Sequence, residues 1–376
     1  MHVRPSCRVL SLSLSASPLA GCNYEGGDPR KEIGADPPLP ALQQYLVPPI
    51  QIARVAAWGN ETPAVPQGLQ VHALATGFEH PRSLYVLPNG DVLVVESNGP
   101  KPPINRPKDI LTDWVTWFAG AAAKGGNRIT LLRDSNGDGI PDLRTVFLDH
   151  LNSPFGVALV GNDLYVANTD AIIRYPYQEG QTGITAPGTK LTDFPGGPIN
   201  HHWTKALLAS PDGSKLYVGV GSNSNITENG IGAEYERAAI WEVDRASGAH
   251  RIFASGTRNP TGLAWEPETR KLWAVVNERD EIGPDLVPDY LTTSPRGGSV
   301  TDCIASIQFV SKLMITCCSW IRSPRTVGTA GAKSVRNDTR WLFNSRCTSE
   351  IISAAYSKRR SRPVGLLRPV SPGLVE

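Results

Sequence analysis

A β-hairpin pattern occurs four times between residues 81 and 277. Each copy has an apolar strand, a turn built from Pro, Asn, Asp or Gly, and a second apolar strand that ends in or next to a polar residue. The copies are Pro81–Glu96, Pro154–Asn168, Trp203–Val220 and Pro260–Asn277. Whole hairpins that recur at intervals of roughly 50–70 residues are typical of β-propeller blades. We therefore predict an all-β propeller with about four readable blades; a β-sandwich with similar turns is the alternative.

The third hairpin carries the most chemically active side chains at its ends. Trp203–Ala209 is predicted as one strand and Lys215–Val220 as the next, joined by a Pro-Asp-Gly turn. His201 and His202 precede the first strand, and the Gly-Ser-Asn-Ser-Asn loop Gly221–Asn225 follows the second. A hairpin brings its outer ends together. The pattern therefore predicts that a histidine and a cluster of amides and hydroxyls share one rim of the sheet.

The first residues are typical of an export signal. A basic start precedes a short apolar run, Val9–Leu19. Leu19–Cys22 resembles the lipobox of bacterial lipoproteins, so we predict that residues 1–22 are a lipoprotein signal and that Cys22 is acylated. An ordinary cleavable signal with an incidental cysteine is the alternative. Residues 23–39 then form a Gly/Pro-rich tether, and the protein is anchored by lipid in the cell envelope, facing the periplasm or the exterior.

Residues 40–298 are assigned to the propeller, which is incomplete, and Pro100–Lys124 interrupt its blade pattern. Within this insertion Ile110–Ala123 is predicted to form a short helix, which is either a lid or a packing element.

A second irregular stretch, 134–142, places oxygen-bearing side chains at alternate positions around a Gly-rich turn. Asp134, Asn136 and Asp138 are candidate calcium ligands, because hard cations prefer such oxygens. The match to an EF-hand loop is partial, since Thr145 stands where that loop has Glu. Asx-rich turns often bind nothing, and this alternative stays open.

The fourth hairpin has charged and polar residues at both ends. Arg258 and Asn259 stand directly before its first strand, at the rim position that His202 takes in the preceding hairpin. An arginine there offers a bidentate fork for a carboxylate or another anionic oxygen. The second strand is followed by an acidic stretch. Its candidate calcium ligands are Glu278, Asp280 and Asp285. A solvated acidic loop is the alternative.

These separated motifs together resemble one known family. His202, Arg258–Leu263 and Asn277–Asp280 occur in the order of the glucose/sorbosone dehydrogenase family of quinoprotein six-bladed propellers. Asn105–Asp109 and Lys124–Arg128 are similar to its sorbosone dehydrogenase-like branch. The resemblance covers residues 70 to 293.

The resemblance implies a pyrroloquinoline quinone (PQQ) cofactor held with calcium at the centre of the propeller rim. It places the family's base on His202 and its quinone-contacting Arg-Asn pair on Arg258 and Asn259. Thr261 stands at the next contact, where the soluble glucose dehydrogenases have Gln. A neutral imidazole near its usual pKa suits proton abstraction from a sugar hydroxyl, and Arg258 and calcium suit the developing quinone oxyanion. His201 is the rival base.

The function expected from this resemblance is PQQ- and calcium-dependent oxidation of an aldose or a sugar aldehyde. The partners expected are a small sugar or aldehyde, a downstream cytochrome or quinone, and the membrane through the lipid anchor, but not nucleic acid. Two alternatives are a non-catalytic propeller that binds a ligand at its rim and a calcium-dependent propeller lactonase or hydrolase. Only the first of the three functions needs quinone.

Residues 299–376 depart from the blade pattern. They contain 12 Lys and Arg against 4 Asp and Glu, and four of the six cysteines of the chain. One hypothesis is a basic tail that binds anionic lipid or nucleic acid. The favoured hypothesis is a shift of reading frame near Gly297 and Gly298, because exported proteins seldom carry clustered, unpatterned cysteines without a disulfide framework. Under this hypothesis two of the six blades are absent, and we expect this chain to be impaired as an enzyme. Sequencing the gene across these two codons tests this hypothesis.

Overall fold

The computed structural model describes residues 63–104, 107–122, 125–197, 199–225, 227–280, 289–293 and 367–369. The predicted signal segment 1–22, the tether 23–39 and Asp285 lie outside these residues, as does the tail 299–376 except for 367–369.

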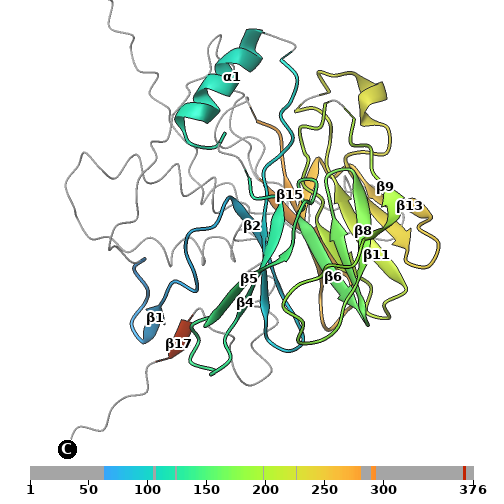
Figure 1. Cartoon of the computed structure of the whole chain (residues 1–376). Coiled ribbons are helices and arrows are strands. Elements are labelled where there is room, and N and C mark those ends of the chain that lie inside the picture. Colours follow the sequence, from blue (N-terminus) through green and yellow to red (C-terminus); the bar gives the residue numbers. More distant parts are fainter. Residues whose placement is uncertain are drawn as a thin grey trace, which may run out of the picture.

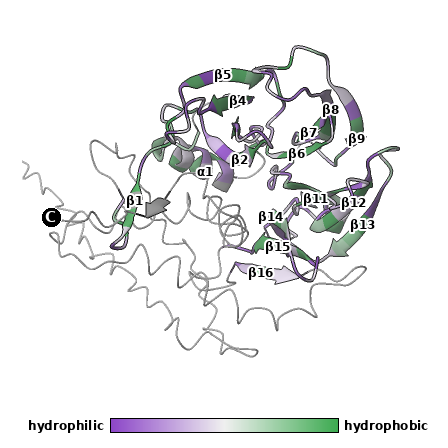
Figure 2. Cartoon of the chain, turned by 90° about the horizontal axis from the view of Figure 1, so that it is seen from below, coloured by the Kyte–Doolittle hydropathy of each residue, from purple (hydrophilic) through white to green (hydrophobic). Residues whose placement is uncertain are grey.

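Four antiparallel sheets follow one another along the described part of the chain. The first contains β2 (Pro81–Val86), β3 (Val92–Glu96), β4 (Arg128–Arg133) and β5 (Leu143–Leu148), and the second contains β6 (Gly156–Val160), β7 (Asp163–Ala167), β8 (Ala171–Pro176) and β9 (Thr189–Asp193). The third contains β10 (Leu207–Ala209), β11 (Lys215–Val220), β12 (Ala239–Asp244) and β13 (His250–Ser255), and the fourth contains β14 (Asn259–Trp265), β15 (Leu272–Asn277) and β16 (Tyr290–Thr293). Figure 2 shows the sheets arranged around part of a ring. The prediction of an all-β propeller with four readable blades is confirmed.

Each predicted hairpin forms the first two strands of one blade. At the open end of each hairpin, the paired residues are Pro81 and Glu96, Gly156 and Ala167, Leu207 and Val218, and Asn259 and Asn277. One boundary was predicted wrongly, because the first strand of the third hairpin begins at Leu207 and not at Trp203. The carbonyl of Trp203 accepts hydrogen bonds from the side chains of Thr169 and Lys205, which takes this residue out of the ladder.

The blades pack against each other through both faces of their strands. Every residue of β3 is buried, because neighbouring elements cover both faces of this strand. A strand covered in this way needs apolar side chains at nearly every position. Three clusters fill the spaces between successive blades, and their largest members are Phe147 and Tyr177, Tyr165 and Trp241, and Tyr217 and Phe253. Burial of one such side chain stabilises the fold by about 1.5–3 kcal/mol.

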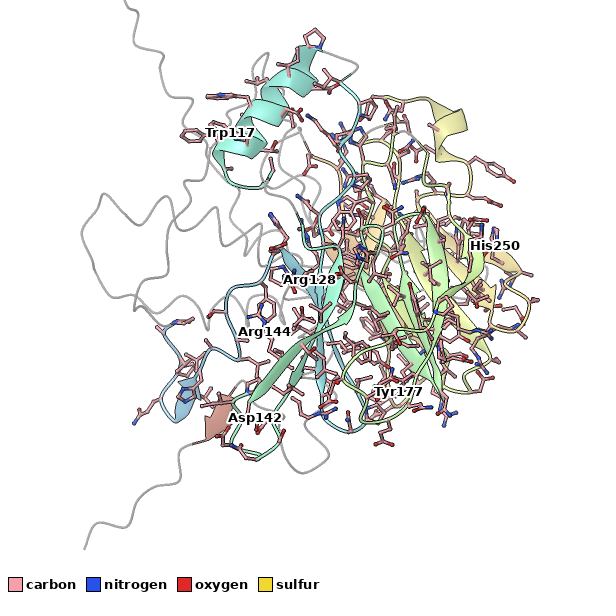
Figure 3. The ribbon with its side chains drawn as sticks, in the orientation of Figure 1. Trp117, Arg128, Asp142, Arg144, Tyr177 and His250 are labelled. Atoms are coloured by element: carbon pink, nitrogen blue, oxygen red, sulfur yellow. The ribbon has the colours of Figure 1, made fainter. Side chains whose placement is uncertain are left out.

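One face of the first blade is covered by the segment that precedes it. Leu74 and Phe78 pack against buried residues of β3, and the Arg144 guanidinium lies 4.3 Å from the centre of the Phe78 ring. Figure 3 shows Arg144 on this flank. Leu84 and Val86 remain 42% and 50% exposed among the described residues. Their neighbour Tyr85 packs toward the second blade, so these two side chains point to the opposite face.

Two buried carboxylates accept hydrogen bonds that link the strands of the first blade. Arg133 donates two hydrogen bonds, 2.8 and 2.7 Å long, to Asp91. Glu96 is fully buried and accepts from the Glu79 amide at 2.6 Å, from Arg128 at 3.1 Å and from Thr130. Burial alone would raise the pKa of the Glu96 carboxyl, but the hydrogen bonds from Arg128 and Thr130 outweigh it and hold the pKa below its ordinary value.

The insertion of the first blade contains α1 (Pro107–Phe118), which differs from the predicted Ile110–Ala123. Proline is favoured at the first helical position, and Gly120, with a φ of 71°, follows the end of the helix. Trp114 and Trp117 are 52% and 69% exposed, and α1 stands apart from the blades (Figures 1 and 3). In the described part of the chain no helix has the length and apolar character needed to cross a membrane.

Two short elements complete the described structure. The 3₁₀ helix η1 (Ile231–Glu234) lies in the loop between β11 and β12, at the same end of the strands as α1 (Figure 1). β1 (Leu69–Val71) pairs with β17 (Leu367–Pro369), a strand that the sequence pattern of the tail did not predict.

Candidate active site

The loops after the second strands meet the starts of the next blades on one rim of the propeller. Three hydrogen bonds repeat this link between successive blades: Ser97 Oγ to Pro154 O at 2.5 Å, Thr169 Oγ1 to Trp203 O at 3.0 Å, and Ser222 N to Arg258 O at 2.7 Å. The rim therefore joins residues that are far apart in sequence. The predicted neighbourhood of His202 and the polar Gly221–Asn225 loop is confirmed, because the His202 ring contacts Ser222.

His202 is half-buried at the centre of this rim. Its Nδ1 lies 2.6 Å from the carbonyl oxygen of Ser222. A carbonyl only accepts, so Nδ1 must carry the proton, and Nε2 keeps a lone pair that can take up a proton. Burial, together with the positive charge of Arg258, lowers the pKa of His202 to about 3. The expectation of a pKa near the ordinary value was wrong, because the sequence does not reveal this burial.

His201 differs sharply from its neighbour. Its side chain is exposed, whereas His202 is half-buried and its ring nitrogen is bonded to Ser222. This difference favours His202 over His201 as the residue with a defined tautomer at the rim.

Gly221 and Asn259 pack directly against His202. A Cβ atom placed on Gly221 would lie 2.5 Å from Asn259 Oδ1 and 2.5 Å from His202 Cβ. Only glycine leaves room for this contact. Asn259 is 9% exposed, and its Oδ1 has no hydrogen-bond partner among the residues that the structure describes. A buried polar atom without a partner is uncommon in folded proteins and suits a site that receives a ligand or an ordered water.

Arg258 contacts three segments of the rim. Its guanidinium donates to the backbone carbonyl of Asn225 at 3.2 Å and to its Oδ1 at 2.7 Å. It also donates to the carbonyls of Asn277, at 3.3 Å, and of Glu278. Asp280 Oδ2 lies 3.5 Å away. Arg258 is thus 12% exposed and held in place by its own chain, with its positive charge next to His202.

The remaining predicted rim residues take different positions. Thr261 donates to Asn277 Oδ1 at 2.8 Å, so its hydroxyl faces the neighbouring strand. The carboxylates of Glu278 and Asp280 lie in different surroundings. Burial raises the pKa of Glu278, partly offset by a hydrogen bond from Tyr290, whereas the Asp280 side chain is 82% exposed. Their predicted partner Asp285 lies outside the described residues.

The carboxylates of the loop 134–142 accept hydrogen bonds from backbone amides of the same loop. Asp134 accepts from the amides of Gly137 and Gly139, both at 2.7 Å, and Asp138 accepts from the amide of Ile140 at 2.7 Å. Asn136 Oδ1 accepts from the Asp138 amide at 2.9 Å. Within the described ranges, no three His, Cys, Asp or Glu side chains form a group that could hold a metal ion. Calcium at either predicted place stays a prediction.

Two buried cations behind His202 were missed by the sequence reasoning. Lys205 is fully buried, and Arg237 is 6% exposed. A lysine or arginine in a loop is usually solvated, so no local signal marked either one. Burial lowers the pKa of the Lys205 ammonium well below its ordinary value and that of Arg237 to about 10. The charges of Arg258 and Arg237 both lower the pKa of His202.

Arg258 suits an anionic ligand such as a polycarboxylate quinone, and the Asn259 Oδ1 acceptor suits a hydrogen-bond donor on that ligand. Asn259 Oδ1 has no hydrogen-bond partner among the described residues, and the neighbouring Arg258 is positively charged. Calcium has weaker support, because Glu278 is partly buried whereas the Asp280 side chain is exposed.

The fold and the site thus define a β-propeller with a histidine-centred polar rim. Residues 122–289 match the protein family described as TrAA12-like, which confirms, for this segment, the resemblance inferred from the sequence. The matched segment includes His202, Arg258 and Asn259. A search of curated proteins gave no match.

Several solved structures are similar to parts of the chain. The iodide structure of a Trichoderma reesei carbohydrate-active enzyme of family AA12 is 18% identical, with a TM-score of 0.49, over 63% of this chain and 59% of that chain. The holo form of the pyranose dehydrogenase PQQ domain from Coprinopsis cinerea is 18% identical, with a TM-score of 0.45, over 63% and 54%. The PQQ-bound aldose sugar dehydrogenase from Streptomyces coelicolor is 18% identical, with a TM-score of 0.41, over 63% and 67%. The chain thus spans less than two thirds of the first two proteins.

Proposed function

We propose that the protein oxidises an aldose or a sugar aldehyde with PQQ and calcium, as a quinoprotein of the glucose/sorbosone dehydrogenase type. The match of residues 122–289 to the TrAA12-like family supports this proposal, as do the ordered motifs around His202 and Arg258. The electron acceptor that follows the quinone is proposed to be a cytochrome or another quinone.

The geometry of His202 is the observation that carries the proposal. Its Nδ1 is bonded to the Ser222 carbonyl, so Nε2 is the proton acceptor. Burial and Arg258 keep the ring neutral at neutral pH. A neutral imidazole with a fixed tautomer suits abstraction of the hydroxyl proton of a sugar while hydride leaves the adjacent carbon. An anion bound beside Arg258 would offset its charge and raise the pKa of His202, which makes the ring a stronger base.

The other rim residues bind and orient in this proposal. Bound PQQ supplies a two-electron acceptor. Arg258 and Asn259 would hold its polar edge, with Thr261 at the neighbouring contact. Glu278, Asp280 and Asp285 are the proposed calcium ligands, and Asp134, Asn136 and Asp138 a second proposed site.

Reconstitution of the full chain with PQQ and calcium, followed by dye reduction with a panel of aldoses, tests the proposal. We expect PQQ-dependent turnover, and His202→Ala should lower the rate by about 10²–10⁴ while PQQ still binds. His201→Ala is the matched control and should leave the rate nearly unchanged. PQQ-independent hydrolysis of lactones with calcium, or ligand binding without turnover, would refute the dehydrogenase proposal.

We also propose that Cys22 anchors the protein to the cell envelope. The lipobox-like Leu19–Cys22 after an apolar run supports this.

A further inference from the structure

His202 stands between two segments that are each held by a buried cation. One segment is the peptide that carries His202 itself. The other contains Ser222, whose carbonyl sets the tautomer of the ring. Both segments are loops without regular strand pairing at these residues, so backbone ladders alone do not fix their separation.

Lys205 holds the first segment. Its Nζ donates to the carbonyl oxygens of His202 at 3.2 Å and of Trp203 at 3.1 Å. These are consecutive carbonyls, so one amino group bridges the peptide that bears the ring. The Lys205 side chain is fully buried and cannot exchange these acceptors for bulk water. Two hydrogen bonds in such a low-dielectric place restrain the backbone strongly.

Arg237 holds the second segment. It donates to the Gly221 carbonyl at 3.0 Å, next to Ser222, and to Asn200 Oδ1 at 2.6 Å, next to the histidine pair. It also donates to the carbonyl of Pro195. One guanidinium thereby joins both loops that flank the His202 ring. Neither Lys205 nor Arg237 forms a salt bridge with any residue that the structure describes, and burial disfavours the charged form of both side chains.

We propose that Lys205 and Arg237 are positioning residues that hold the His202 imidazole from its two sides. This inference rests on the proposed function in one respect, since it assigns His202 as the base. The hydrogen bonds themselves do not depend on which reaction follows. An arrangement held in this way keeps Nε2 at one place on the rim, and a shift of about 1 Å in a reacting group can cost about 10²-fold in rate.

Nitrogen NMR of the histidine rings in the full chain without cofactor tests the positioning directly. Wild-type His202, assigned by comparison with His202→Gln, should show one protonated Nδ1 and one unprotonated Nε2. Lys205→Met removes the donor with little change in volume, and we expect its His202 signals to show mixed tautomers. Lys215→Met is the matched control, because Lys215 pairs with Asp244 at the half-exposed foot of the same hairpin. It should leave the His202 signals unchanged.

Kinetics of the reconstituted enzyme supply the second readout. With turnover counted per bound PQQ, Lys205→Met and Arg237→Lys should each lower kcat by about 10–100-fold, with KM and PQQ affinity unchanged. Lys205→Gln retains an N–H donor and should recover part of the loss. A purely structural role would lower the amount of folded protein but not kcat per bound PQQ.

The outcomes separate the two proposals. If wild type shows no PQQ-dependent activity, the proposed function fails, while the NMR signals still decide the positioning. Wild-type signals and kcat in Lys205→Met would overturn the inference. It would also be overturned if circular dichroism showed that both Lys205→Met and Lys205→Gln are unfolded, because Lys205 would then serve fold stability.

Discussion

Gly221→Ala offers a direct test of the packing at the rim. The added Cβ would lie 2.5 Å from both His202 Cβ and Asn259 Oδ1. Ordinary contacts of this kind are about 3.5–4 Å, so each of the two contacts must lengthen by about 1 Å. Overpacking of this size costs about 1–3 kcal/mol of the free energy of unfolding.

The same displacement should also change cofactor binding and turnover, because the two contacted residues, His202 and Asn259, belong to the candidate site. We expect PQQ affinity and turnover of Gly221→Ala to fall together, with turnover reduced by about 10²-fold. Urea unfolding measures the first effect, and PQQ titration with dye reduction measures the second. Gly232→Ala is the control, since its Cβ would meet no atom within 4 Å. If Gly221→Ala matched wild type in stability and PQQ affinity, the argument from close packing at His202 would be refuted.

Three further predictions concern other residues. The pKa of His202 is about 3 in the folded chain and about 6.5 when unfolded, so its contribution to stability is present above pH 6.5 and is lost as pH falls toward 3. Urea unfolding at pH 7 and pH 4 should therefore show that His202→Gln loses less free energy of unfolding on acidification than wild type does. Equal losses in the two proteins would contradict this. Glu96→Gln should lower the free energy of unfolding by about 3–5 kcal/mol, because it breaks a buried pair with Arg128. Asp193→Asn in the exposed Lys190 pair should cost at most about 1 kcal/mol, and similar urea midpoints for these two variants would contradict the burial argument. Mass spectrometry of the membrane fraction should find a diacylglyceryl group on Cys22, and a soluble protein that starts at another residue would end that proposal.

The sequence alone determined the hairpin architecture and one neighbourhood of the rim. The period-2 apolar pattern and the Pro/Asn/Asp/Gly turns are local properties, so four hairpins and their turns could be predicted from neighbouring residues. A hairpin also brings its ends together, so the meeting of His202 with the loop around Ser222 was predictable.

Only the tertiary structure decided the chemistry of these side chains. The pKa of His202, the hydrogen bonds of Arg258 and the different burial of Glu278 and Asp280 depend on tertiary packing, which no local pattern encodes. The clearest case is Lys205 and Arg237. Lysine and arginine side chains are usually expected to be solvated at the surface. The packing of the folded chain instead buries both side chains, and each donates hydrogen bonds to the backbone around His202.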